Sequence, residues 1–144
     1  MTLHLGCPRL SVDPSAIRVV KDERVMVEFA AAPGVLMSAV GPNHYGVGDA
    51  LITGSTGDRW SVTRDRFDVK YRPADGQLPG SPGFYRNVPI PIWAKRIQQP
   101  FTIERQAGGD RLEGKAGDWA VEYSPNDCGL VARDRFDAVY RPIP

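Results

Sequence analysis

The segment GDALITGSTGDRWSVTRDRFDVKYRP at residues 48–73 decides the organisation of this chain, because it returns as GDWAVEYSPNDCGLVARDRFDAVYRP at residues 117–142. The two segments are identical at 13 of 26 positions, and the offset of 69 residues is constant throughout. Chance matching at average residue frequencies would give roughly two identities. The sequence therefore predicts two copies of one structural unit.

The similarity continues upstream of this segment in weaker form. The stretch Arg24–Phe29 (RVMVEF) occupies the same place as Ile92–Ile97 (IWAKRI), at an offset close to that of the main match. We therefore expect a unit of about 60 residues that begins near Ile17 and again near Phe84. Two independent pieces of about 60 residues would bury only about 60% of their unfolded surface, so we expect the two units to share a core.

Composition sets the predicted boundaries between these units. The stretch ADGQLPGSPGFYRNVPIP is rich in proline and glycine, which is typical of a connection. The first residues of the chain show no regular apolar pattern. We predict an N-terminal tail at residues 1–15, repeat unit 1 at 16–74, a Pro/Gly-rich connection at 75–90 and repeat unit 2 at 91–144.

The apolar pattern inside each unit favours short strands. Phe67, Val69 and Tyr71 alternate with polar residues, as expected of a half-buried strand, and the second copy repeats the pattern. The four-residue spacing from Phe67 to Tyr71 also fits one face of a helix, so Arg64–Phe67 is alternatively a helical turn leading into the strand. The expected fold class is mainly β, with α+β possible. It comprises two similar antiparallel β-units of about five short strands, packed as a pseudo-twofold pair.

The Gly-Asp block carries a resemblance to a known family. The second copy reads Gly117-Asp-Trp-Ala-Val121 and closes with Phe136 and Tyr140, and the first copy keeps a later turn, Gly57-Asp-Arg-Trp60. This pattern resembles the small bacterial and phage proteins named for their PGDYG motif. The resemblance implies a fold but no reaction.

A second repeated block supplies the candidate binding residues. Arg64-Asp-Arg-Phe-Asp68 is identical to Arg133-Asp-Arg-Phe-Asp137. Duplicated arginines are able to form an anion site through their bidentate forks, but the same arginines and aspartates can pair with each other around a buried Phe. We favour the structural interpretation. A ligand site between the copies would use Arg64, Arg133, Trp60, Trp119, Asp49 and Asp118.

Other site chemistry finds little support in the sequence. Only His4 and His44 are available as bases near pKa 7, so no catalytic residue is predicted. Cys7 and Cys128 are too few for a disulfide framework or a zinc site, and Cys128 is interpreted as a quiet thiol. The aspartates lack the spacing of a calcium loop. No cofactor and no metal are expected.

Charge and termini narrow the partner class. The 18 basic and 17 acidic residues give a net charge of +1, which leaves no surplus for nucleic-acid phosphates. No stretch approaches the roughly 20 apolar residues of a membrane span, and the start lacks signal-peptide features, so we expect a cytoplasmic location. The predicted function is a non-catalytic binding or accessory role, with a protein partner bound at strand edges or in a groove between the units. A small-ligand or nucleotide-binding protein is the alternative, and an enzyme ranks third.

Overall fold

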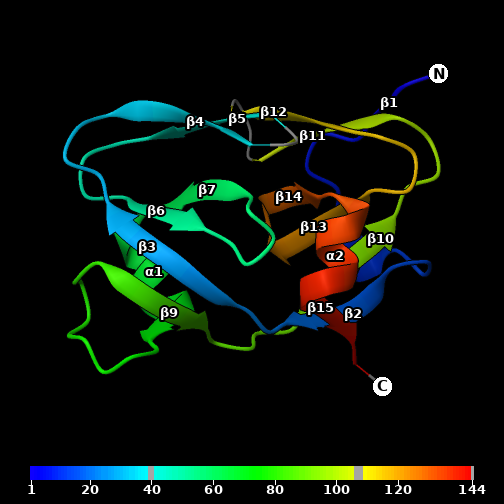
Figure 1. The fold of residues 1–144 in the computed structure, drawn as a ribbon. Helices are drawn as coiled ribbons and strands as arrows, with labels where there is room; N and C mark the ends of the chain where they lie inside the picture. Colours follow the sequence, from blue (N-terminus) through cyan, green and yellow to red (C-terminus); the bar gives the residue numbers. More distant parts are fainter. Residues whose placement is uncertain (39–40, 106–108, 144) are drawn as a thin grey trace. The chain divides into compact units, whose positions relative to one another are not determined.

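A computed structural model describes residues 1–38, 41–105 and 109–143, and the chain in it is mainly β (Figure 1). The predicted mainly β class is therefore confirmed. The chain forms two compact units, and each is described by itself. The terminal unit consists chiefly of Met1–Val20 and Pro91–Pro144, and the central unit consists of Lys21–Ser38 and Pro42–Ile90.

The central unit is built on a five-stranded sheet in which all neighbouring strands are antiparallel. Buried and exposed residues alternate along Arg24–Phe29. Val25 and Val27 are 1% and 0% exposed, whereas the residues between and beside them are exposed. In spatial order the strands are β7 (Arg59–Val62), β6 (Ala50–Thr53), β3 (Arg24–Phe29), β9 (Gly83–Asn87) and β8 (Tyr71–Pro73).

The terminal unit contains a second five-stranded sheet with a corresponding order of strands. Its strands β13 and β14 stand where the central sheet has β6 and β7, at the offset of the repeated segment. In spatial order the strands are β14 (Asp127–Val131), β13 (Trp119–Ser124), β10 (Ile92–Arg96), β2 (Ile17–Lys21) and β15 (Tyr140–Pro142).

One strand in each sheet comes from the other half of the chain. In the sequence β2 directly precedes β3, and β9 precedes β10. Nevertheless β2 pairs with β10, with Val19 opposite Ile92, and β9 pairs with β3, with Tyr85 opposite Val25. Figure 1 shows β2 in the sheet of β10 and β9 in the sheet of β3. We call this arrangement the strand exchange.

The strand exchange makes the compact units differ from the predicted boundaries 16–74 and 91–144. The predicted connection at 75–90 contains β9, whose Tyr85 is 1% exposed. The predicted tail at 1–15 contains β1 (Leu3–His4) and a 3₁₀ turn, η1 (Leu10–Val12), whose Leu10 is 2% exposed. The proline and glycine residues around β9 made this five-residue strand resemble a connection. The first residues pack against strands that are distant along the chain, so their own pattern did not predict structure.

A short helix precedes the last strand of each repeat. The helices are α1 (Arg64–Lys70) and α2 (Arg133–Val139), so the strand predicted to begin at Phe67 is wrong for 67–70. The helical alternative is correct and extends further than one turn. The four-residue spacing places Phe67 against Tyr71, with near-parallel rings 5.2 Å apart. Val69 lies away from this face and is 61% exposed.

Each helix covers one face of its own sheet. Phe67 of α1 packs with Val25, Val27 and Tyr85 in the core of the central unit. The terminal unit repeats this arrangement, where Phe136 and Val139 of α2 form the core with Val19, Ile92, Ala94, Val121, Val131 and Tyr140. The buried Phe that the structural interpretation predicts is thus present in both copies. Burying an aromatic of this size contributes about 1.5–3 kcal/mol.

In each unit a hairpin follows β3 or β10 along the chain and contacts the sheet face opposite the helix. In the central unit it consists of β4 (Gly34–Ser38) and β5 (Gly41–Tyr45), and Ser61 of β7 donates a hydrogen bond to Asn43 of β5 at 2.6 Å. In the terminal unit it consists of β11 (Phe101–Glu104) and β12 (Arg111–Gly114), and β1 adds to β11 as a parallel strand.

The terminal unit buries this second face as well. Leu10 of η1, Phe101 and Ile103 of β11 pack on Ala120 and Leu130 of the sheet. The strands β13 and β14 of the terminal sheet are therefore covered on both faces by the chain itself.

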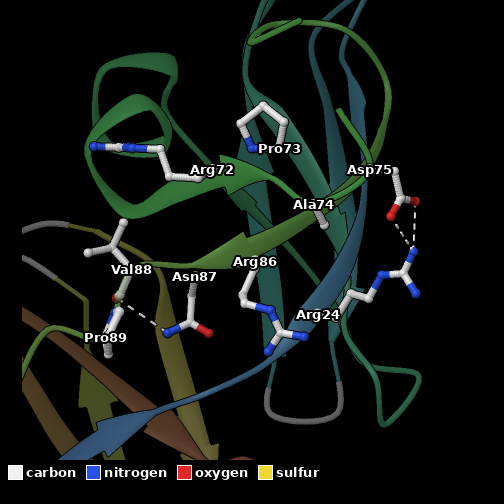
Figure 2. Close-up of a pocket in the computed structure, with 9 residues that line it drawn as sticks. All are labelled: Arg24, Arg72, Pro73, Ala74, Asp75, Arg86, Asn87, Val88 and Pro89. Atoms are coloured by element: carbon white, nitrogen blue, oxygen red, sulfur yellow. Dashed lines mark hydrogen bonds and ion pairs between the residues drawn. The ribbon is translucent and has the colours of Figure 1, made fainter. Parts of the chain in front are cut away.

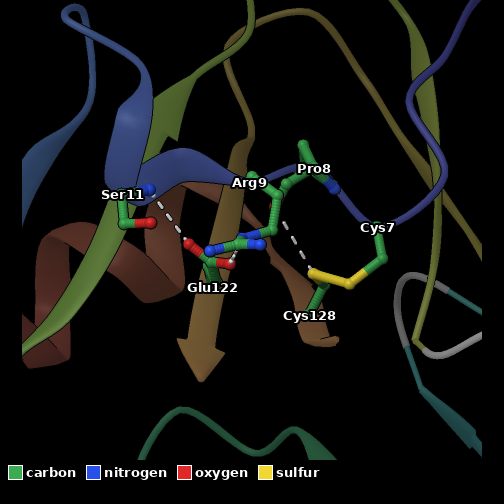
Figure 3. The surroundings of a disulfide bond; sticks show 6 residues. All are labelled: Cys7, Pro8, Arg9, Ser11, Glu122 and Cys128. Carbon is green, nitrogen blue, oxygen red and sulfur yellow. Dashed lines mark hydrogen bonds and ion pairs between the residues drawn. A yellow bond between two sulfur atoms is a disulfide. The ribbon is translucent and has the colours of Figure 1, made fainter. Parts of the chain in front are cut away.

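A disulfide fastens the N-terminal segment to this face. Cys7 and Cys128 are bonded, with their Cα atoms 5.5 Å apart, so the interpretation of Cys128 as a quiet thiol is wrong (Figure 3). Beside the bond, Glu122 is only 3% exposed, accepts the Ser11 N–H at 3.0 Å and pairs with Arg9 at 3.4 Å. Two cysteines 121 residues apart gave no local signal for this contact.

Candidate functional site

A pocket of about 540 Å³ lies in the central unit over strands β3, β8 and β9 (Figure 2). Arginines dominate its charged lining, and Figure 2 shows Arg24 and Arg86 side by side with Arg72 pointing away from them. The residues that line the pocket are Arg24, Arg72, Pro73, Ala74, Asp75, Arg86, Asn87, Val88 and Pro89.

Strand register places three arginines at opposed positions of neighbouring strands. Arg86 of β9 lies directly opposite Arg24 of β3 on one side and Arg72 of β8 on the other. Side chains at opposed positions of neighbouring strands point to the same sheet face. The alternate positions, such as Val25 and Tyr85, point to the opposite face and are buried under α1. We call Arg24, Arg86 and Arg72 the arginine row.

Two aspartates accompany the arginine row. The Nη2 of Arg24 donates to both carboxylate oxygens of Asp75 at 2.8 and 2.7 Å, and Arg86 pairs with Asp22 at 2.8 Å. The aspartate side chains are 52% and 47% exposed. Pairs this exposed contribute about 0.2–1 kcal/mol each.

Arg72 makes its contacts with the backbone. Its Nη1 donates to the carbonyl oxygens of Asp68 at 2.6 Å and of Tyr71 at 2.9 Å. These bonds hold the guanidinium at the C-terminal part of α1, and Figure 2 shows the Arg72 side chain pointing away from Arg24 and Arg86. Against two aspartates, the three arginines leave one positive charge in excess.

Apolar side chains continue the same sheet face. The next opposed pair beyond Arg24 and Arg86 is Met26 and Phe84, which are 39% and 37% exposed. The guanidinium of Arg24 lies 4.2 Å from the centre of the Phe84 ring. We call the arginine row together with Met26 and Phe84 the arginine face.

The terminal unit lacks this combination. Thr53 and Glu122 are 69 residues apart and lie opposite Met26 and Trp93, so Met26 and Trp93 are equivalent positions. Counting along the strands from this pair gives the equivalents of the arginine row. They are Pro91 for Arg24, Val20 for Arg86 and Arg141 for Arg72.

Asp49 and Asp118 both serve the Gly-Asp turn. An Oδ2 atom accepts the N–H of Gly46 in one copy and of Lys115 in the other, both at 2.9 Å. The glycine before each aspartate has a φ of 86° or 97°, a conformation that favours glycine. The same turn is thus built twice, and the two carboxylates are occupied by backbone contacts.

Arg64 and Arg133 make local pairs, and they lie in different units. The Nε of Arg64 pairs with Asp68 at 3.0 Å, and its guanidinium lies 4.9 Å from the ring centre of Phe29. The Nε of Arg133 is 3.4 Å from Asp134. These contacts are the ones that the structural interpretation of the repeated block requires.

The two candidate tryptophans also have packing contacts. Trp60 packs against the core of the central unit, with Lys21 Nζ 5.3 Å from its ring centre. Trp119 stacks on Phe136, with ring centres 3.9 Å apart. Its buried Nε1 has no hydrogen-bond partner within the part of the chain that the structure describes.

One of the two histidines, His4, makes contacts within the terminal unit. The Nδ1 of His4 lies 3.0 Å from the Thr102 hydroxyl and 2.9 Å from Arg111, which places it among structural contacts. Across residues 1–38, 41–105 and 109–143, no group of three or more His, Cys, Asp or Glu side chains is arranged to hold a metal ion. The same ranges contain no helix long and apolar enough to cross a membrane.

Sequence reasoning missed the arginine row because it missed β9. Arg24 and Arg72 fall on the exposed side of stretches that were expected to be strands. Arg86 lies in the predicted connection, and nothing local places it between the other two. The alternation Phe84-Tyr85-Arg86-Asn87, flanked by turn residues, was the available signal.

Comparison with known proteins yields one match. A family model described as PGDYG protein matches residues 41–141, a range that includes both copies of the repeated segment. The searches of curated proteins and of solved structures return no match.

Proposed function

Because the chain belongs to the PGDYG protein family, which implies no reaction, we propose from its geometry that it is a non-catalytic binding protein. Its partner is another protein, which it contacts through the arginine face of the central unit. The observation that supports this proposal is that the face is exposed and that its arginines lie next to Met26 and Phe84. Arginine and aromatic residues are enriched in protein interfaces and in their energetic centres.

Strand edges are less suited to this role than the sheet face. One edge of the central sheet is β8, which has three residues and ends in Pro73. Short edge strands and prolines oppose the addition of a further strand. The other edge strand, β7, is bonded to the hairpin through Ser61.

We further propose that the chain arose by tandem duplication of one unit. The 13 identities in 26 positions support this origin. The corresponding strand orders and the twice-built Gly-Asp turn support it as well. The arginine face would then be a specialisation of one copy.

Quantitative affinity capture tests the proposed surface. The double variant Met26→Ala, Phe84→Ala removes exposed apolar area from the arginine face. Val69→Ala is the matched control, because Val69 is also exposed but lies on α1. We expect a partner retained by wild type and by the control to be lost by the double variant.

One outcome of the capture experiment would reject the arginine face as the binding surface. If the double variant retains every partner of the wild type at equal occupancy, and remains folded by circular dichroism, the arginine face is not the binding surface.

A second candidate function is the binding of a small anionic ligand. It is favoured by the pocket volume, which falls within the range of about 300–1,000 Å³ typical of ligand sites. A ligand at 100 times its Kd would stabilise the protein by about 2.7 kcal/mol in a thermal-shift screen.

The disulfide bears on the expected cytoplasmic location. Disulfides persist in oxidising compartments and are rare in the reducing cytosol. We propose that the protein works where the bond between Cys7 and Cys128 survives. Alkylation of thiols in intact cells tests this, because a modified Cys7 would place the working protein in a reducing compartment.

A further inference from the structure

We propose that the arginine row binds the phosphate group of a phosphorylated side chain on the partner protein. This inference rests on the proposed function and names the chemistry that the arginine face recognises. It concerns Arg24, Arg72 and Arg86, whereas the surface itself is tested above through its apolar residues.

Three like charges occupy opposed positions on neighbouring strands of the central sheet. Like charges directly opposite on neighbouring strands destabilise a sheet, and here three arginines are opposed in succession. The aspartates that compensate them, Asp22 and Asp75, are half exposed. A sheet face assembled in this way gains from any ligand that carries more negative charge than a carboxylate.

The contact that Asp75 already makes with Arg24 favours a phosphate ligand over a carboxylate ligand. Asp75 already presents both of its oxygens to Arg24. A Glu or Asp from a partner would replace this contact with an equal one and add little. A phosphate carries a charge of about −1.5 to −2 and three acceptor oxygens, so it can bond two guanidinium groups at once.

Strand spacing assigns the central role to Arg86. Neighbouring strands lie about 4.8 Å apart, so the row spans about 10 Å from β3 to β8. One phosphate therefore reaches two neighbouring arginines, and Arg86 with Arg24 is the opposed pair that Figure 2 shows side by side.

The surroundings suit a phosphorylated residue within a peptide segment. The pocket volume of about 540 Å³ accommodates a phosphorylated side chain together with atoms of its neighbours. Phe84 and Met26 beside the row offer a contact for an adjacent apolar side chain. The segment would thus be recognised by charge in the pocket and by apolar contact next to it.

Calorimetric titration of the full-length protein in phosphate-free buffer tests the proposal. The probes are three acetylated, amidated peptides of sequence Leu-Gly-Xaa-Gly-Leu, where Xaa is phosphoserine, serine or glutamate, and inorganic phosphate alone. We expect the phosphoserine peptide to bind at least about tenfold more tightly than the glutamate peptide. It should also bind more tightly than inorganic phosphate.

Three variants locate the site. Arg86→Val introduces the residue of the equivalent terminal position, Val20, and should abolish the preference for phosphoserine. Arg86→Lys keeps the charge without the bidentate fork and should weaken it severalfold. Arg141→Ala, the equivalent of a change at Arg72 in the terminal unit, should leave it unchanged.

Several results would overturn the proposal. They are equal affinity for phosphoserine and glutamate peptides, affinity for free phosphate as high as for the phosphoserine peptide, no binding by any probe, or unchanged binding in both Arg86 variants. Arg86→Lys keeps the test decisive if Arg86→Val fails to fold. None of these results alters the capture experiment with Met26 and Phe84, so the two proposals fail separately.

Discussion

The central and terminal units arrange five strands in a corresponding order and place a seven-residue helix on one face, yet they use the other face differently. In the terminal unit β13 and β14 are buried on that face beneath η1, β1 and β11, and a disulfide fastens the cover. In the central unit the part formed by β3, β9 and β8 carries the arginine face. The same strand order thus carries a second apolar core in one unit and an exposed row of arginines in the other.

Residue choice at equivalent positions explains the difference. Lys95 of the terminal unit bonds Asp13 at 2.8 Å and so helps to hold the N-terminal cover, whereas its central equivalent is Glu28. The central positions equivalent to Pro91 and Val20 are both arginines. The central sheet therefore presents charged side chains at two positions where the terminal sheet has Pro91 and Val20.

The largest effect is expected where the units are alike. Phe67→Ala and Phe136→Ala each remove a buried ring that stacks on a tyrosine four residues later. Each change should lower the free energy of unfolding by about 3–5 kcal/mol. Urea denaturation followed by circular dichroism measures both, and a loss below 1 kcal/mol for either would break the equivalence of the helices.

The disulfide should produce the next largest effect, in the terminal unit. It joins residues 121 positions apart, so its loss should reduce the free energy of unfolding by about 2–5 kcal/mol. Urea denaturation with and without a dithiol reductant measures the loss. The control is the Cys7→Ser, Cys128→Ser variant, which should match the reduced wild type and not respond to reductant.

The Gly-Asp turn should give a smaller effect that is equal in both units. Gly48 and Gly117 have φ values of 86° and 97°, where an alanine is strained by about 1–2 kcal/mol. Gly48→Ala and Gly117→Ala should each destabilise the protein by this amount in thermal unfolding. A neutral result at one position alone would show that the two turns are not equivalent.

The smallest effect is an acid response of the terminal unit. The hydrogen bond from Lys95, supported by two from Ser15, lowers the pKa of Asp13 from 3.8 to about 2. A carboxylate with a lowered pKa stabilises the folded state above its unfolded pKa, and the contribution is lost as the pH falls from about 4 to about 2. Asp13→Asn should flatten the pH dependence of Tm in this window. An unchanged slope would contradict the assignment.

Local chemistry in the sequence was sufficient for much of the fold. The alternation at Val25 and Val27, the Gly-Asp turns and the core roles of Phe67 and Phe136 all follow from nearby residues. The strand exchange and the disulfide do not, because both join segments distant along the chain. The arginine row was missed for the same reason, since Arg86 reaches it only through β9.

The strand exchange is the claim on which the arginine row depends, and nuclear Overhauser contacts between backbone protons test it most directly. The account predicts contacts between Met26 and Phe84 and between Trp93 and Arg18, which are opposed across β3–β9 and β10–β2. Contacts that instead pair β2 with β3 and β9 with β10 as local hairpins would contradict it. They would also remove Arg86 from its place between Arg24 and Arg72.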